Sequence, residues 1–102
     1  MIGMSQNFSA YKEDVSTLAD GSTIIAQPCR VYTITFALEG AGDATISISN
    51  SEGYSSTSRV EKVVLTDEKK THTITYPTGK FFSVGLSVTS NLAGVDVGVT
   101  YE

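Results

Sequence analysis

The chain has 102 residues, the length of a single domain, and 40% of them are hydrophobic, which is enough for one core. Its formal net charge is −4 and its seven Lys and Arg residues are scattered, so the basic stripe of a nucleic-acid-binding protein is missing. A lone cysteine, Cys29, excludes an intrachain disulfide, and no apolar run is long enough to cross a bilayer. We therefore expect no nucleic acid, no membrane partner and no secretory signal, and production in a reducing cytoplasm.

The first twenty residues are patterned differently from the rest. Tyr11, Val15 and Leu18 recur at the i, i+4 and i+7 spacing of a helix, but a segment this short is marginal without tertiary packing. We expect an N-terminal arm over residues 1–20, formed as a short helix or as an irregular segment. The remaining residues, 21–102, are predicted to form the folded domain.

From residue 21 to residue 49 the chain alternates apolar and polar side chains, which predicts strands. A short strand over residues 23–27 is expected to stop at Pro28, because proline cannot donate to a sheet. The longest strand, residues 29–38, is predicted to bury one set of side chains: Tyr32, Ile34, Phe36 and Leu38. Its other set is predicted to face solvent or a partner: Val31, Thr33, Thr35 and Ala37. A glycine-rich turn at residues 40–43 leads to a strand over residues 44–49.

The second half of the chain continues in the same way. A Ser- and Gly-rich loop over residues 50–58 precedes a strand over residues 59–66, and a charged turn leads to a strand over residues 71–76. Pro77-Thr78-Gly79-Lys80 predicts another turn. The next strand is expected to bury Phe82, Val84, Leu86 and Val88, and the last strand covers residues 95–101.

Strands this short, separated by turns about every 8 to 12 residues, are typical of a β-sandwich. We therefore predict an all-β fold, an antiparallel, jelly-roll-like β-sandwich of seven or eight short strands. An up-and-down barrel is the alternative, because closing a sheet also removes its edges.

Catalytic and metal-binding constellations are missing from the sequence. His72 is the only histidine, and no serine stands in a nucleophile-elbow motif beside it. One Cys and one His cannot fill a zinc site unless carboxylates complete it, and the acids Asp20, Glu39, Asp43 and Asp96 follow no calcium-loop spacing. We expect no enzymatic activity, no catalytic residue, no cofactor and no metal.

Sugar binding is the small-ligand function that a sandwich most readily supports. Sugars stack on Trp and Tyr rings, and this chain has five Tyr residues and no Trp. Tyr54, in the Ser-rich loop, is the candidate ligand-contact residue for a carbohydrate-binding or adhesin-like module.

Three stretches of the folded domain have a recognisable pattern: residues 25–32 (IAQPCRVY), 79–88 (GKFFSVGLSV) and 95–102 (VDVGVTYE). Through them, residues 23–102 resemble small β-sandwich virion proteins of tailed phages. Such proteins are capsid decoration or cement proteins, or head and tail accessory proteins, so the resemblance implies a non-enzymatic virion component. The resemblance implies that the partner is the major capsid protein or another virion protein. It also implies that the chain forms a homo-oligomer, with a trimer favoured.

A virion protein needs a surface for its partners. We expect this self-association surface to include the outward side of the longest strand and the apolar residues of the arm: Val31, Thr33, Thr35, Ala37, Tyr11 and Val15. The competing reading is an ordinary solvent-facing strand and a frayed terminus. A capsid-binding structural protein and a saccharide-binding module therefore remain the two functional hypotheses.

Overall fold

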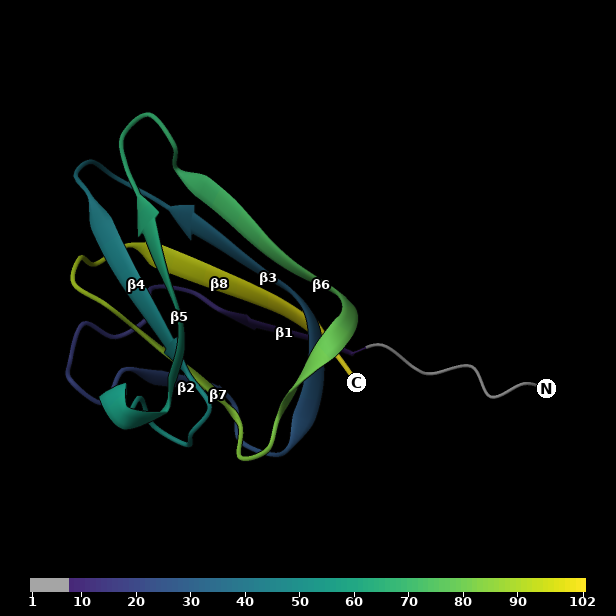
Figure 1. Cartoon of the computed structure of the whole chain (residues 1–102). Coiled ribbons are helices and arrows are strands. Elements are labelled where there is room, and N and C mark those ends of the chain that lie inside the picture. The colour runs from purple at the N-terminus through teal and green to yellow at the C-terminus, as the bar shows by residue number, and fades with distance from the viewer. Residues whose placement is uncertain (1–7) are drawn as a thin grey trace.

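The computed structural model describes residues 8–102, and short strands account for most of them (Figure 1). The strands are β1 (Phe8–Lys12), β2 (Ser22–Ile25), β3 (Cys29–Leu38), β4 (Ala44–Ser49), β5 (Arg59–Leu65), β6 (Thr71–Phe82), β7 (Leu86–Ser90) and β8 (Val95–Tyr101). A 3₁₀ turn, η1 (Ser56–Ser58), precedes β5. No α-helix occurs in residues 8–102.

The strands form two four-stranded sheets that face each other (Figure 1). Sheet A has the order β1-β8-β3-β6 and sheet B the order β2-β7-β4-β5, and all neighbouring strands are antiparallel. Every connection except that from β4 to β5 passes from one sheet to the other, which is the jelly-roll arrangement. The predicted antiparallel sandwich is confirmed, and the barrel alternative is not formed because the two sheets remain separate.

The core lies between the sheets and consists almost entirely of aliphatic side chains. Alternation places one side of each strand inward, and the buried inward residues are Ile46 and Ile48 of β4, Val63 and Leu65 of β5, and Val95, Val97 and Val99 of β8. The buried hydrophobic residues are Val15, Ile25, Cys29, Val31, Ile34, Phe36, Leu38, Ala44, Ile46, Ile48, Val63, Leu65, Phe82, Leu86, Val88, Val95, Val97 and Val99. Phe36 and Phe82 are the two largest side chains in this core, and both are fully buried.

A bulge in β3 overturns part of the predicted alternation. Val31 was predicted to face outward and Tyr32 inward, but Val31 is fully buried and Tyr32 is only partly buried. The register with both neighbouring strands shifts between Val31 and Thr33. Because an inserted residue reverses the alternation, the inward positions before the bulge have odd numbers and those after it have even numbers.

The same irregularity explains the wrong turn prediction at residues 77–80. These residues belong to β6, where residues 76–79 bulge out opposite Tyr32, between the pairs Thr33–Thr75 and Val31–Lys80. Gly79 has φ +80, and a Cβ there would lie 2.5 Å from Arg30 Cγ, so glycine allows the bulge to pack against β3.

The true turn lies at residues 83–85, and Val84 is 48% exposed in it instead of buried. The side chain of Asn50, far away in sequence, holds this turn. Its Oδ1 accepts hydrogen bonds from the Val84 N–H at 2.9 Å and from the Gly85 N–H at 3.3 Å.

The N-terminal segment is part of the sandwich from residue 8 onward, and the predicted short helix is wrong. β1 pairs with β8 along its whole length, and the chain then turns at Asp14, which has φ +50. The Val15 N–H donates to the Val95 carbonyl at 2.8 Å, and the Val15 side chain is buried in the core. Val15 therefore contributes to folding and cannot belong to the predicted partner surface. Residues 1–7 of the predicted arm lie outside the described residues.

Candidate functional site

The outer side of sheet A carries a regular array of hydroxyl groups, here called the threonine face. Its members are Thr33 and Thr35 on β3, Thr71, Thr73 and Thr75 on β6, and Thr100 on β8. Directly paired residues of antiparallel strands point to the same side of a sheet, and the residues that alternate with these threonines pair with core side chains. The threonines therefore point away from the core.

The register places these threonines and their neighbours in three rows across the sheet. The rows are Ser9–Thr100–Thr33–Thr75, Tyr11–Gly98–Thr35–Thr73 and Asp96–Ala37–Thr71. Their side chains are short, apart from that of Tyr11, and within these rows only Asp96 carries a charge. The result is a surface of low relief without the concave shape of a small-molecule site.

The hydroxyl groups of this face bond to one another across the strands. Thr33 Oγ1 and Thr100 Oγ1 are 2.6 Å apart, and Thr35 Oγ1 and Thr73 Oγ1 are 3.3 Å apart. In each pair, one hydroxyl donates a hydrogen bond that the other accepts, so part of the hydrogen-bonding capacity of both groups is satisfied within the chain. A second surface can therefore cover the pairs at a smaller desolvation cost than it would incur with unpaired hydroxyls.

Tyr11 and Asp96 occupy one margin of the threonine face. The Tyr11 ring lies beside Gly98, where an added Cβ would be 3.7 Å from Tyr11 Cδ1, and the side chain is 64% exposed. Partial desolvation and then the Asp96 carboxylate raise the pKa of Tyr11. Asp96 Oδ1 also accepts a hydrogen bond from the Asp14 N–H at 2.9 Å, so its carboxylate is anchored to the β1–β2 connection.

The structure brings together four of the six residues predicted for a partner surface. Thr33, Thr35, Ala37 and Tyr11 share the outer side of sheet A, whereas Val31 and Val15 are in the core. The threonines of β6 and β8 are further members of this surface that were not predicted from the sequence. The alternation Thr71-His72-Thr73-Ile74-Thr75 signals one polar side, but only the strand pairing shows that it lies beside β3.

The Tyr54 loop is held against the sandwich, and ligand contact by Tyr54 stays a prediction. Tyr54 is partly buried, and its N–H donates to the Asp20 carbonyl at 2.7 Å. Hydroxyl groups hold the loop to neighbouring strands, since Gly53 N–H donates to Thr23 Oγ1 at 2.8 Å and Ser87 Oγ donates to the Ser51 carbonyl at 2.8 Å. These bonds pin the loop as part of the sandwich.

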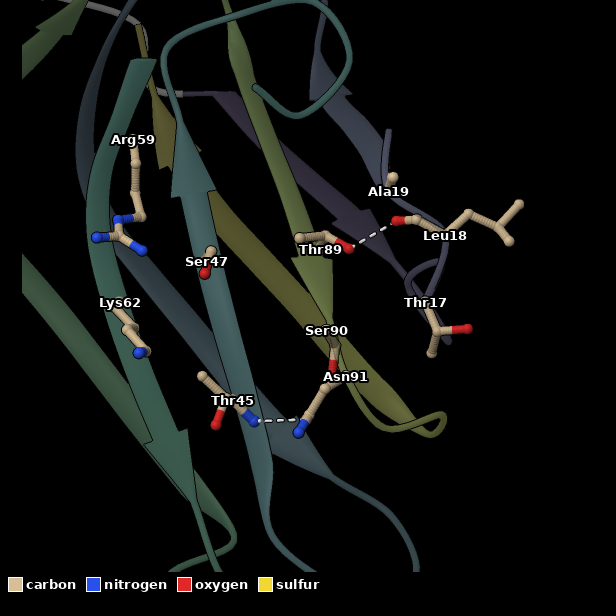
Figure 2. A pocket seen from close by; sticks show the side chains of 10 residues that line it. All are labelled: Thr17, Leu18, Ala19, Thr45, Ser47, Arg59, Lys62, Thr89, Ser90 and Asn91. Carbon is tan, nitrogen blue, oxygen red and sulfur yellow. Dashed lines mark hydrogen bonds between the residues drawn. The ribbon is translucent and has the colours of Figure 1, made fainter. Parts of the chain in front are cut away.

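The outer side of sheet B has a different shape. A groove of about 470 Å³ runs over β7, β4 and β5 and is bounded by the connection that contains Leu18 (Figure 2). Thr45 and Ser47 lie on its floor, and Arg59 and Lys62 lie on the β5 side. Tyr54 does not line it.

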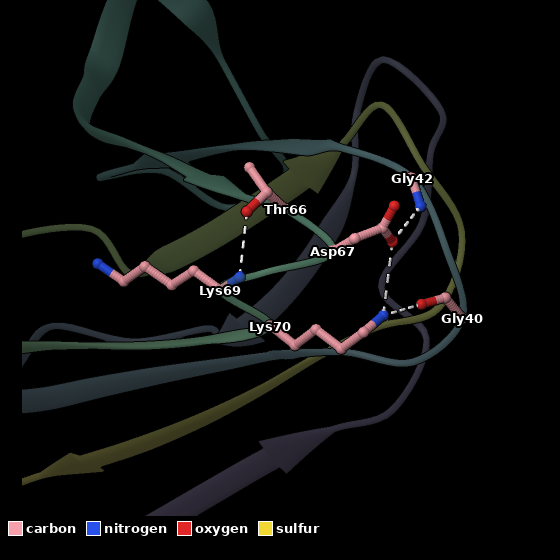
Figure 3. Close-up of polar contacts among 6 residues, drawn as sticks. All are labelled: Gly40, Gly42, Thr66, Asp67, Lys69 and Lys70. Carbon is pink, nitrogen blue, oxygen red and sulfur yellow. Dashed lines mark hydrogen bonds and ion pairs between the residues drawn. The ribbon is translucent and has the colours of Figure 1, made fainter.

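A third polar cluster joins two connections at one end of the sandwich (Figure 3). The Gly42 N–H donates to Asp67 Oδ1 at 2.8 Å, and the Lys70 ammonium donates to the Gly40 carbonyl. Lys70 Nζ is also 3.7 Å from Asp67 Oδ1. These contacts tie the β3–β4 connection to the β5–β6 connection, which is a structural role.

The residues considered for chemistry lie apart from one another. His72 is partly buried on the inner side of β6, opposite Phe36. Cys29 is buried, and burial raises the pKa of its thiol. In the described part of the chain no group of three or more His, Cys, Asp or Glu residues could hold a metal ion.

A scan against protein-family models, a search of curated proteins and a search of solved structures find no match to this chain. Over residues 8–102 no helix has the length and apolar character needed to cross a membrane.

Proposed function

We propose that the protein is a non-enzymatic structural protein that binds another protein through its threonine face. The observation that carries this proposal is the continuous, nearly uncharged array of Thr33, Thr35, Thr73 and Thr75 and their neighbours on sheet A. The chain as a whole carries a formal charge of −4, yet Asp96 is the one charged residue in the three rows of this face.

Three physical properties suit this face to a protein contact. Interface cores are depleted of charged residues, as this face is. Threonine is β-branched and has few χ1 rotamers, so its immobilisation costs less entropy than that of a long side chain. The cross-strand pairs Thr33–Thr100 and Thr35–Thr73 limit the number of hydroxyls that a partner must satisfy.

The proposed partner is the major capsid protein lattice of a virion, so that the chain acts as a decoration or cement protein that stabilises the head. The resemblance to small virion proteins of tailed phages supports this choice. The jelly-roll architecture is compatible with it, because capsid and lectin domains both use this arrangement, although a fold alone does not decide a function. A homo-oligomer, preferably a trimer, follows from the same resemblance.

The test measures binding of the purified chain to virions that lack it. The gene for this chain is deleted from the virus that carries it, and virions that lack the protein are purified. These virions are mixed with the purified chain and separated from unbound protein by sedimentation. We expect the wild-type chain to appear in the particle fraction. Thr35→Lys places a charge in the middle of the threonine face and should reduce binding at least about tenfold, because a buried unpaired charge is costly.

The matched control is Thr57→Lys, an exposed threonine in η1 outside this face, which should bind like the wild type. The proposal is overturned if the wild-type chain stays with free protein, or if the two lysine variants bind equally well. Sedimentation velocity of the free chain tests the oligomer separately, and a monomer at all concentrations would contradict the trimer.

A further inference from the structure

The groove on sheet B has the chemistry of a ligand site and plays no part in the proposed docking role. Its floor is formed by neighbouring strands, on which Ser47 of β4 pairs with Thr89 of β7 and with Lys62 of β5. Its volume of about 470 Å³ falls within the range of small-molecule sites, although the groove is open to solvent. Figure 2 shows polar side chains from three strands directed into one space.

Two cations stand on one side of the groove without acidic partners. Arg59 and Lys62 are exposed on β5, and no Asp or Glu lines the groove. Neither takes part in an ion pair within residues 8–102, where the only such pair joins Lys70 to Asp67. Because the chain is acidic overall, this cationic side is a local exception that favours an anionic group.

The remaining polar groups add donors and hydroxyls. Asn91 Oδ1 accepts a hydrogen bond from the Thr45 N–H at 2.8 Å, which leaves the Asn91 amide nitrogen as a donor. The Ser47 and Thr45 hydroxyls also line the groove and are able to donate and to accept hydrogen bonds. A ligand that matches them carries both an anion and its own hydroxyl groups.

The connection that contains Leu18 bounds the groove on the side opposite the cations. The Leu18 side chain is 69% exposed, and the loop that carries it is held in place because Thr89 Oγ1 donates to the Leu18 carbonyl at 2.8 Å. Figure 2 shows this bond, with the Leu18 carbonyl turned toward Thr89 and the Leu18 side chain turned away from Arg59 and Lys62. This connection therefore limits the groove on that side through its backbone.

We propose that this groove binds an acidic saccharide, with the sugar carboxylate at Arg59 and Lys62. The arginine can hold a carboxylate with two parallel hydrogen bonds, and the lysine contributes a second charge. Ser47 and Thr45 contact the ring hydroxyls. This site is separate from the threonine face and from the predicted Tyr54 site.

The test is a titration of the isotopically labelled full chain, followed by amide NMR, with four probes. These are sialyllactose, a galacturonic acid disaccharide, lactose and inorganic phosphate. We expect the two acidic sugars to shift the amide signals of Ser47, Lys62 and Thr89, and lactose and phosphate to bind at least about tenfold more weakly. Arg59→Gln and Lys62→Gln should each weaken the binding of the two acidic sugars by a similar factor.

Lys12→Gln is the matched control, because Lys12 is an exposed cation on sheet A and its loss changes the net charge equally. Three results overturn the proposal: equal binding of lactose and sialyllactose, binding of phosphate as tight as that of the acidic sugars, or affinities unchanged in Arg59→Gln. Binding of Arg59→Gln to virions should remain at the wild-type level, so this proposal and the docking role fail independently.

Discussion

The outer sides of the two sheets are built on the same backbone pattern but present opposite surfaces. The threonine face of sheet A has paired hydroxyls and a single charge at its margin, whereas the outer side of sheet B has a groove with two unpaired cations. The inner sides of both sheets are alike, with buried aliphatic residues that make one core. The fold is therefore specified by the inner residues, and the outer residues are free to differ with function.

This division predicts that the largest effects come from the shared core. Phe36→Ala should lower the free energy of unfolding by about 3–5 kcal/mol, because it removes a fully buried ring and leaves a cavity. Thr35→Ala, at the adjacent outward position, should change it by less than about 1 kcal/mol. Urea unfolding of both variants measures the difference, and comparable losses would contradict the assignment of inner and outer sides.

A second prediction concerns the independence of the two outer surfaces. Thr35→Lys should reduce virion binding at least about tenfold and leave acidic-saccharide affinity within about twofold of wild type, and Arg59→Gln should do the reverse. The double variant should show both losses without further coupling, because the residues lie on different sheets. Loss of both activities in either single variant would mean that the two surfaces act as one site.

The hydroxyl pairs of the threonine face should contribute a smaller effect. Thr33→Val or Thr100→Val alone leaves one hydroxyl without its partner and should lower the free energy of unfolding by about 0.5–1 kcal/mol. The double variant should lower it by less than the sum of the two single losses. A double-mutant cycle based on urea unfolding gives the coupling energy. Additive losses would show that the 2.6 Å contact does not stabilise the sheet.

The smallest change in stability at neutral pH is expected for a substitution of Tyr76 on β6. The Tyr76 hydroxyl is buried without a hydrogen-bond partner among the described residues, so Tyr76→Phe should change stability by less than about 0.5 kcal/mol or increase it. Burial and then the Glu61 charge raise the pKa of Tyr76 from 10.0 to about 12.

The raised pKa gives Tyr76 a distinct alkaline behaviour. Between pH 10 and 12 the unfolded chain loses the Tyr76 proton while the folded chain keeps it, so stability falls as pH rises. Unfolding measured across this range should show a shallower fall for Tyr76→Phe than for the wild type. Parallel curves would contradict the buried, protonated state of this hydroxyl.

The sequence was sufficient to predict the sandwich, because alternation marks the inner side of each regular strand. It failed where the alternation is interrupted: the bulge at Tyr32 buries Val31, and the bulge at residues 76–79 imitates a turn. The turn at Val84 is held by Asn50, a long-range contact with no local signal. Likewise, Tyr11 and Val15 show helical spacing but lie on either side of the turn at Asp14.

The two candidate surfaces were predictable to different degrees. Thr33 and Thr35 were visible as the outer side of the longest strand, but the contribution of β6 and β8 depends on strand order, which alternation does not encode. The groove was not predicted at all. It combines Leu18, Asn91 and Arg59 from distant parts of the chain, whereas the motifs of the sequence point to Tyr54.

Spin labels attached to single cysteines test the docking role of the threonine face most directly. Cys29 is buried and should remain unlabelled, so Thr73→Cys and Thr57→Cys can be labelled selectively on and off this face. Binding to virions should immobilise the label at residue 73 and leave the label at residue 57 mobile. A label at residue 73 that stays mobile in the bound chain would contradict the proposed docking surface.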